Sequence, residues 1–276
     1  MVCVYSHYLK SNMLPHNKYI YFLLFFCLVN SLQLLTAAPL HTLSDTATEG
    51  LVSDSSGLTK YDSLFNKLSL GKLGLGRRAY DYAMIGYDVL KAKNKLSNPH
   101  IISIADMTTA SGRKRFFVID VKNSKLLFVT YVAHGRNSGL DKTLHFSNEK
   151  ESNKSSVGFY ITSVTYSGAH GYSMRLIGQE IGYNNNALER DIVVHSADYV
   201  SEAVIKSQGY IGRSLGCPAL SAAVYKPIID KIKNGSCLFI YGNDTKYIVN
   251  SGLLKRPLKL KKNNKIKNSS LEPTLR

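Results

Sequence analysis

The chain has 276 residues, 44% of them hydrophobic, which is enough for one sizeable globular core with extensions at both ends. Its formal net charge is +16, and residues 255–276 carry eight Lys or Arg against one Glu. A basic tail of this kind favours anionic surfaces, so an anionic envelope surface is a candidate partner. The tail has no interleaved aromatic residues and no recognisable nucleic-acid module, which argues against a specific nucleic-acid binder.

The N-terminus is typical of an export signal. A weakly basic stretch precedes an apolar core at residues 19–29, which is too short for a comfortable membrane span. Cleavage after Ala37 predicts a signal peptide over 1–37, and hence an exported protein of the periplasm or cell envelope without a transmembrane domain after cleavage. Two alternatives stay open, namely Met13 as the true start and an uncleaved anchor helix.

Residues 38–57 are rich in Ser, Thr, Asp and Gly and are expected to form a linker. A helical region is predicted over 58–98, because apolar residues recur at helical spacing in 58–70 and 77–96. Beyond Pro99, β-branched and aromatic runs alternate with short polar turns, and the first three such runs read as an antiparallel meander. The predicted strands are 101–106, 115–121, 125–134, 157–166, 174–178, 191–197 and 237–242.

Two short helices are predicted at 198–207 and 221–234, the second with Ser221 as its N-cap and Asn234-Gly235 as its stop. The expected fold class is therefore mostly β, a sandwich or barrel over 99–245 with the N-terminal helical region and the short helices packed on it. Residues 246–276 are assigned to the basic C-terminal tail.

Cys217 stands in the loop GRSLGCPAL, whose composition suits a nucleophile. A thiol nucleophile needs a base, a group that orients the base, and N–H donors for the oxyanion. Gly216 permits a turn in which the N–H groups of Leu215, Gly216 and Cys217 face one point, and Pro218 stiffens its exit. His195, at the end of the predicted strand 191–197, is the candidate base.

Other readings of these residues stay open. A cysteine in a glycine turn is often structural. A disulfide between Cys217 and Cys237 is a further alternative, although Cys237 lies in the apolar run SCLFIYG of a core strand. His134, His145 and His170 offer zinc ligands together with His195, but their spacings match no helical or knuckle motif. No metal and no cofactor are therefore predicted.

The pieces HSADY (195–199) and GRSLGCPAL (212–220) together resemble the YkuD-like L,D-transpeptidase catalytic domain, in particular its murein L,D-transpeptidase branch. Five further segments match in the same order. The resemblance runs from about residue 58 to 242. The matching segments are VAHGRNSG (132–139), FSN (146–148), SSVGFY (155–160), GAHGYSMRLIG (168–178) and YNNNALERDIVVH (183–195).

The resemblance implies a YkuD-like β fold in which Cys217 is the nucleophile, His195 the base and Ser196 the residue whose carbonyl orients the imidazole. The oxyanion site corresponds to the N–H groups of Leu215, Gly216 and Cys217. The implied reaction is acyl transfer on peptidoglycan stem peptides, with release of D-alanine and a 3→3 crosslink. One alternative is an L,D-carboxypeptidase or another peptidoglycan peptide hydrolase with the same Cys–His pair. The other is a non-catalytic cell-wall-binding protein.

Two departures from the family pattern concern substrate contacts. Leu215 stands where the better-studied branch has histidine, and Ala219 stands where that branch usually has arginine. Candidate substrate contacts are Ser214, Arg213, Arg175, His170 and His134. The two histidines each precede a glycine in a loop, where they either line the substrate cleft or bond backbone carbonyls.

Overall fold

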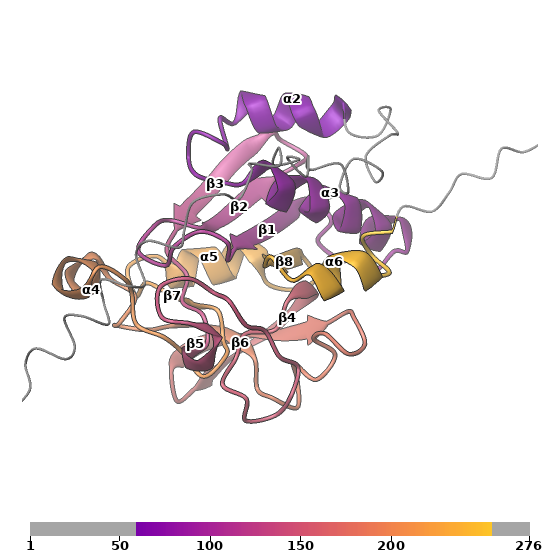
Figure 1. Cartoon of the computed structure of the whole chain (residues 1–276). Coiled ribbons are helices and arrows are strands. Elements are labelled where there is room, and N and C mark those ends of the chain that lie inside the picture. Colours follow the sequence, from indigo (N-terminus) through magenta and orange to yellow (C-terminus); the bar gives the residue numbers. More distant parts are fainter. Residues whose placement is uncertain (1–58, 256–276) are drawn as a thin grey trace, which may run out of the picture. The chain divides into compact units, whose positions relative to one another are not determined.

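The computed structural model describes residues 59–255 (Figure 1). The predicted signal peptide, the predicted linker and the part of the predicted tail beyond residue 255 lie outside the described residues. Within 59–255 no helix combines the length and apolar character needed to cross a membrane.

The described residues form one eight-stranded sheet whose strands follow the order β3-β2-β1-β8-β4-β5-β6-β7 (Figure 1). Neighbouring strands are antiparallel except for the pairs β1–β8 and β6–β7, which are parallel. The strands are β1 (Ile101–Asp106), β2 (Phe116–Asp120), β3 (Lys125–Thr130), β4 (Gly158–Gly168), β5 (Gly171–Gly178), β6 (Val193–Ser196), β7 (Ala219–Leu220) and β8 (Cys237–Tyr241).

The sheet curls until its two ends meet. Val132, just after β3, forms an antiparallel bridge with Leu220 in β7, and the Ala133 N–H donates to the Ala219 carbonyl at 2.8 Å. The result is a nearly closed barrel, which is one of the two mostly β architectures expected from the sequence. Closure also gives hydrogen-bond partners to β7, which would otherwise be a bare sheet edge.

The central strands are buried on both faces. In β1, Ile102 and Ile104 face one apolar cluster, whereas Ile101 and Ala105 face the other, as the two-residue period of a strand requires. The first cluster includes the apolar faces of α2 (Thr59–Lys67) and α3 (Arg77–Ala92), which cover the sheet (Figure 1). The second cluster includes three isoleucines of α5 (Tyr225–Ile232).

The antiparallel meander of β1, β2 and β3 is confirmed. The predicted cap of the 221–234 helix is wrong, because α5 begins at Tyr225 and Val224 occupies its N-cap. Ser221 contributes its backbone carbonyl, which accepts the N–H groups of Val224 and Tyr225. The predicted stop is confirmed, since Asn234 and Gly235 have φ of 62° and 98° just beyond the helix. The other short helix, α4 (Glu202–Gln208), is capped by the Ser201 hydroxyl.

Part of the segment assigned to the basic tail is folded. Helix α6 (Thr245–Asn250) packs Tyr247 into the core, and Leu253 and Leu254 are also buried. The buried carboxylate of Glu180 accepts hydrogen bonds from the Tyr247 hydroxyl (2.9 Å) and the Ser251 hydroxyl. This contact ties the folded end of the chain to the loop between β5 and β6, which carries part of the site described below.

We predict that Tyr247→Phe destabilises the protein by about 1.5–3 kcal/mol, because a buried carboxylate loses a donor. The measurement is the free energy of unfolding in urea. Val249 lies on the same helix with 55% of its surface exposed, so Val249→Ala is the matched control and should change the free energy by less than about 0.5 kcal/mol. Equal effects of the two substitutions would contradict the role given to the Glu180 contact.

Candidate active site

The turn at residues 214–217 is held by its own hydrogen bonds and by the segment after β3. The Ser214 N–H donates to the His134 carbonyl (2.9 Å), and the Arg136 N–H donates to the Ser214 carbonyl (2.7 Å). The Ser214 hydroxyl donates to the Cys217 carbonyl (2.7 Å) and accepts the Gly216 N–H (3.0 Å). Ser214 is thus buried and committed to the turn, and its hydroxyl is not presented to a substrate.

Glycine is required at position 216. Its φ is +130°, and a Cβ placed there would lie 2.8 Å from the Lys154 carbonyl oxygen. The Gly216 carbonyl accepts the Ser155 hydroxyl at 3.3 Å. The turn is therefore supported on one side by residues 134–136 and on the other by residues 154–155.

The Cys217 side chain lies against the first residues of β6. Its Sγ accepts the Val193 N–H at 3.4 Å, and its thiol donates to the Asp191 carbonyl at 3.5 Å. Burial raises the pKa of the Cys217 thiol, against the smaller opposing effects of the Val193 N–H and the Arg190 charge. Cys217 and Cys237 are both free thiols, and Cys237 is buried in β8. At neutral pH the Cys217 thiol is therefore mostly protonated.

The orientation of His195 leaves one ring nitrogen available as a base. Its Nδ1 lies 2.8 Å from the Ser196 carbonyl, which can only accept, so Nδ1 carries the proton. Nε2 of the neutral ring then holds a lone pair. Burial lowers the pKa of His195, and nearby His170 lowers it further, while the Ser196 contact raises it. The ring is consequently neutral at neutral pH.

His170 covers the ring of His195. The two imidazoles are stacked, with centroids 4.4 Å apart and planes inclined by 24°. His170 is exposed and sits in the tight turn between β4 and β5, where Gly171 has φ of +71°. The structure thus places His170 beside the candidate base.

Of the three N–H groups predicted for the oxyanion site, one already has a hydrogen-bond acceptor among the described residues and two do not. The Gly216 N–H is occupied by the Ser214 hydroxyl. The N–H groups of Leu215 and Cys217 have no acceptor among residues 59–255. The Leu215 side chain is 62% exposed and leaves that backbone accessible. Two donors, rather than three, are free to bind an oxyanion in this structure.

The two candidate arginines lie on the surface near the turn. The Arg175 guanidinium stacks over the Tyr166 ring at 4.7 Å and lies 3.5 Å from the Asp191 carboxylate. Arg213 donates to the Arg136 and Gly139 carbonyls, both at 3.3 Å. Arg175 is half-exposed and Arg213 exposed, so each has donors left for a ligand.

His134 is fully buried, so it does not line a cleft in this structure. Its Nδ1 accepts from Arg115 Nη2 at 2.7 Å, and its Nε2 donates to the Gly139 carbonyl at 3.2 Å. Burial and the neighbouring Arg115 charge lower the pKa of His134 to about 4. This histidine fits the alternative of a loop residue that bonds a backbone carbonyl, and it supports the segment on which Ser214 rests.

Two arginines of this region, the buried Arg115 and the half-buried Arg190, are missed by the sequence analysis. Arg115 is fully buried and donates to the carbonyls of Val132 and Thr109 as well as to His134. Arg190 donates to four oxygens of residues 147–156. The sequence gives little indication that either arginine is structurally important. Arg115 stands at the start of an apolar run, and Arg190 stands beside Asp191 in a polar loop.

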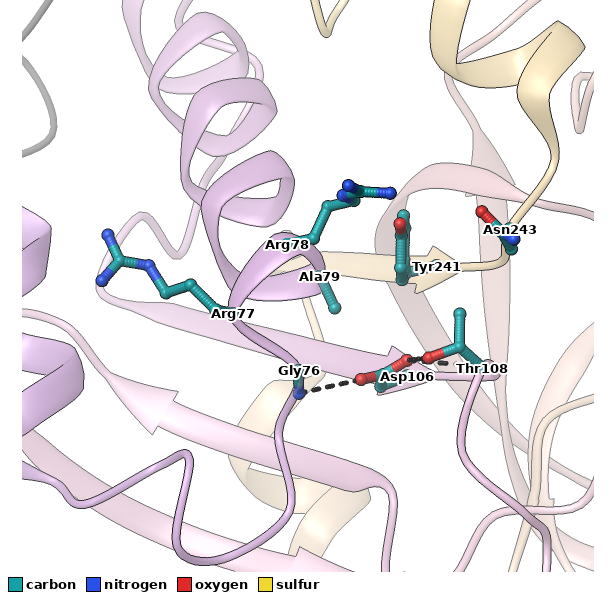
Figure 2. A pocket seen from close by; sticks show the side chains of 8 residues that line it. All are labelled: Gly76, Arg77, Arg78, Ala79, Asp106, Thr108, Tyr241 and Asn243. Carbon is teal, nitrogen blue, oxygen red and sulfur yellow. Dashed lines mark hydrogen bonds between the residues drawn. The ribbon is translucent and has the colours of Figure 1, made fainter. Parts of the chain in front are cut away.

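A pocket of about 300 Å³ lies at the start of α3, apart from the Cys217 turn (Figure 2). Figure 2 shows the Asp106 carboxylate directed at the first turn of that helix, where it accepts the Gly76 N–H at 3.0 Å. The N–H of Gly76, the N-cap residue of α3, is thus already bound by a carboxylate. Within residues 59–255 no group of three His, Cys, Asp or Glu side chains has a metal-binding arrangement.

Comparison with solved structures gives several L,D-transpeptidases at low similarity. That of Mycobacterium smegmatis is 15% identical, with a TM-score of 0.32, and the match covers 52% of this chain and 59% of that one. L,D-transpeptidase 3 from Mycobacterium tuberculosis is 14% identical with a TM-score of 0.33, covering 52% and 61%. The L,D-transpeptidase from Stackebrandtia nassauensis is 15% identical with a TM-score of 0.34, covering 62% and 69%.

No curated protein matches the chain. The family assignment rests instead on a family model, that of the L,D-transpeptidase catalytic domain, which matches residues 72–241 and hence more than half of the chain. This match includes both His195 and Cys217. The chain therefore belongs to the L,D-transpeptidase catalytic domain family, a family of cysteine enzymes that act on peptidoglycan stem peptides.

Proposed function

We propose that this chain is an exported L,D-transpeptidase that joins peptidoglycan stem peptides through 3→3 crosslinks and releases D-alanine. One observation carries the proposal. The Cys217 thiol lies against the strand that bears His195, the imidazole is neutral with Nε2 free, and two N–H groups of the Cys217 turn lack acceptors among the described residues.

In the first step, the Cys217 thiol gives its proton to His195 Nε2 as Sγ attacks the carbonyl carbon of the bond between stem residue 3 and D-alanine. The oxyanion that forms is bound by the N–H groups of Leu215 and Cys217. His195 then gives its proton to the nitrogen of the departing D-alanine, and the C–N bond breaks. The product is a thioester on Cys217.

In the second step, the side-chain amine of a second stem peptide attacks the thioester. His195 takes a proton from this amine and returns it to sulfur as the C–S bond breaks. Both pKa shifts favour a neutral thiol beside a neutral imidazole over an ion pair. Proton transfer therefore accompanies the attack, with His195 acting as a general base.

Arg175 and Arg213 are proposed to bind carboxylates of the stem peptides, because both are accessible near the turn and retain free donors. The signal peptide is proposed to deliver the enzyme to the envelope. The basic residues beyond 255 are proposed to hold it near an anionic envelope surface.

The reaction is tested by incubating the mature protein with a disaccharide-tetrapeptide and analysing the products by mass spectrometry. We expect loss of D-alanine together with crosslinked dimers, and no turnover by Cys217→Ala. Cys237→Ala, which removes the buried thiol of β8, is the matched control and should retain activity. Loss of D-alanine without dimers would replace the transferase by an L,D-carboxypeptidase.

Identical turnover by Cys217→Ala and the unaltered protein would contradict any role of this thiol. Absence of turnover in a folded, unaltered protein would favour the cell-wall-binding alternative.

The lowered pKa of His195 predicts the acid limb of the pH profile. Because the base must be neutral, kcat/KM should fall only as the pH drops below the ordinary histidine value of 6.5. His170→Ala uncovers the His195 ring and removes the neighbouring imidazole, so the midpoint of the limb should move up towards 6.5. His145 is exposed, and His145→Ala serves as the control. A midpoint above 6.5 in the unaltered enzyme would contradict the neutral-base mechanism.

A further inference from the structure

The side chain of Arg190 is inserted beneath the Cys217 turn. One terminal nitrogen, Nη1, donates to the Ser147 carbonyl (2.7 Å) and the Ser156 hydroxyl. The other, Nη2, donates to the Lys154 carbonyl (2.7 Å) and the Ser152 hydroxyl (3.2 Å). All four acceptors are neutral oxygens, so these bonds fix the guanidinium without neutralising its charge.

Among residues 59–255 no carboxylate forms an ion pair with the Arg190 charge, although Glu149 lies near enough to act on it electrostatically. The adjacent Asp191 directs its carboxylate to Arg175. Removing an unpaired cation from water costs free energy. Because Arg190 is half-buried, its charge is screened by water less than a fully exposed charge would be, and it can act on groups packed against it.

The charge lies next to the atoms that contact the thiol. A Cβ built on Gly216 would be 3.2 Å from Arg190 Nη2, which places the guanidinium directly against the turn. Arg190 also precedes the Asp191 carbonyl and the Val193 N–H, the two groups bonded to Cys217 Sγ. The Arg190 charge lowers the pKa of the Cys217 thiol, against the effect of burial.

We propose that Arg190 is a positioning residue that supplies a fixed positive charge to stabilise the Cys217 thiolate as it forms. The inference rests on the proposed function of Cys217 as the nucleophile. Arg190 neither gives nor takes a proton. The proton passes from sulfur to His195 Nε2, and Arg190 stabilises the negative charge left on Sγ until the C–S bond forms.

The charge and the hydrogen bonds of Arg190 are separable by substitution. Arg190→Lys keeps the charge and loses most of the forked bonding, whereas Arg190→Gln keeps an amide donor and loses the charge. A purely structural arginine would be impaired similarly by both. A charge that stabilises the thiolate would be replaced by lysine and not by glutamine.

The experiment measures the rate of Cys217 alkylation by iodoacetamide between pH 6 and 10 in the full mature chain, with the modified peptide identified by mass spectrometry. We expect Arg190→Gln to raise the thiol pKa and slow alkylation at pH 7 by roughly tenfold, since one pKa unit is a tenfold change in thiolate. Arg190→Lys should stay within about threefold of the unaltered rate. Arg136→Gln removes an exposed charge near the same turn and should leave the rate unchanged.

If Arg190→Gln does not fold, a second pair of variants tests whether the Arg190 charge stabilises the Cys217 thiolate. Ser152→Asp would place a carboxylate against Nη2 with the arginine still present, whereas Ser152→Asn has nearly the same shape and no charge. The aspartate variant should slow alkylation and the asparagine variant should not. Equal rates within this pair, or equal slowing by Arg190→Gln and Arg190→Lys, would overturn the inference.

This readout needs no turnover, so it separates the inference from the proposed function. Inactivity towards stem peptides with the expected alkylation pattern would leave the role of Arg190 standing and reject the reaction. If the unaltered enzyme has full transpeptidase activity and Arg190→Gln leaves the thiol pKa unshifted, the reaction stands and the role of Arg190 is rejected.

Discussion

The site depends on the parallel pairing of β6 with β7, which sets His195 opposite Ala219. That register places Cys217, two residues before Ala219, beside Val193, two residues before His195, and the hydrogen bond from the Val193 N–H to Sγ follows from it. β7 is only two residues long, and it is held on its other side by the bridge between Val132 and Leu220. Closure of the barrel therefore keeps Cys217, the proposed nucleophile, beside the strand that carries its candidate base.

Around this pairing, the polar groups of the turn are held by neutral partners. Ser214 accepts one N–H of the turn and bonds one of its carbonyls, and its own backbone rests on the segment that contains His134. Beneath that segment, buried Arg115 donates to His134, whose pKa of about 4 keeps it neutral and able to accept. A turn fixed in this way presents its two remaining N–H groups before any substrate arrives, which is the preorganisation that oxyanion binding requires.

The sequence is sufficient for seven of the eight strands, and it singles out Cys217 and His195 as candidates, because alternation of apolar residues and the loop motif are both local signals. Other features depend on contacts between distant segments. β7 has only two residues, which is too short for a periodic pattern in the sequence. The hydrogen bond from the Gly216 N–H to the Ser214 hydroxyl depends on where the Ser214 side chain points. Helix α6 lies within a lysine-rich region, and Tyr247 is recognisable as core only once Glu180 is seen to accept its hydroxyl. The burial of Arg115 and the partial burial of Arg190 likewise depend on the oxygens that surround them.

The central claim is that the Cys217 thiol attacks the stem peptide and carries the acyl group. The most direct measurement is rapid acid quenching of the mature protein with a tetrapeptide stem in the absence of an acceptor, followed by intact-mass and peptide-mass analysis. The account predicts a mass increase equal to the stem peptide without its terminal D-alanine, located on Cys217 and labile to hydroxylamine, as a thioester is. Release of D-alanine with no adduct on Cys217 at any quench time, and at an equal rate in Cys217→Ala, would contradict it.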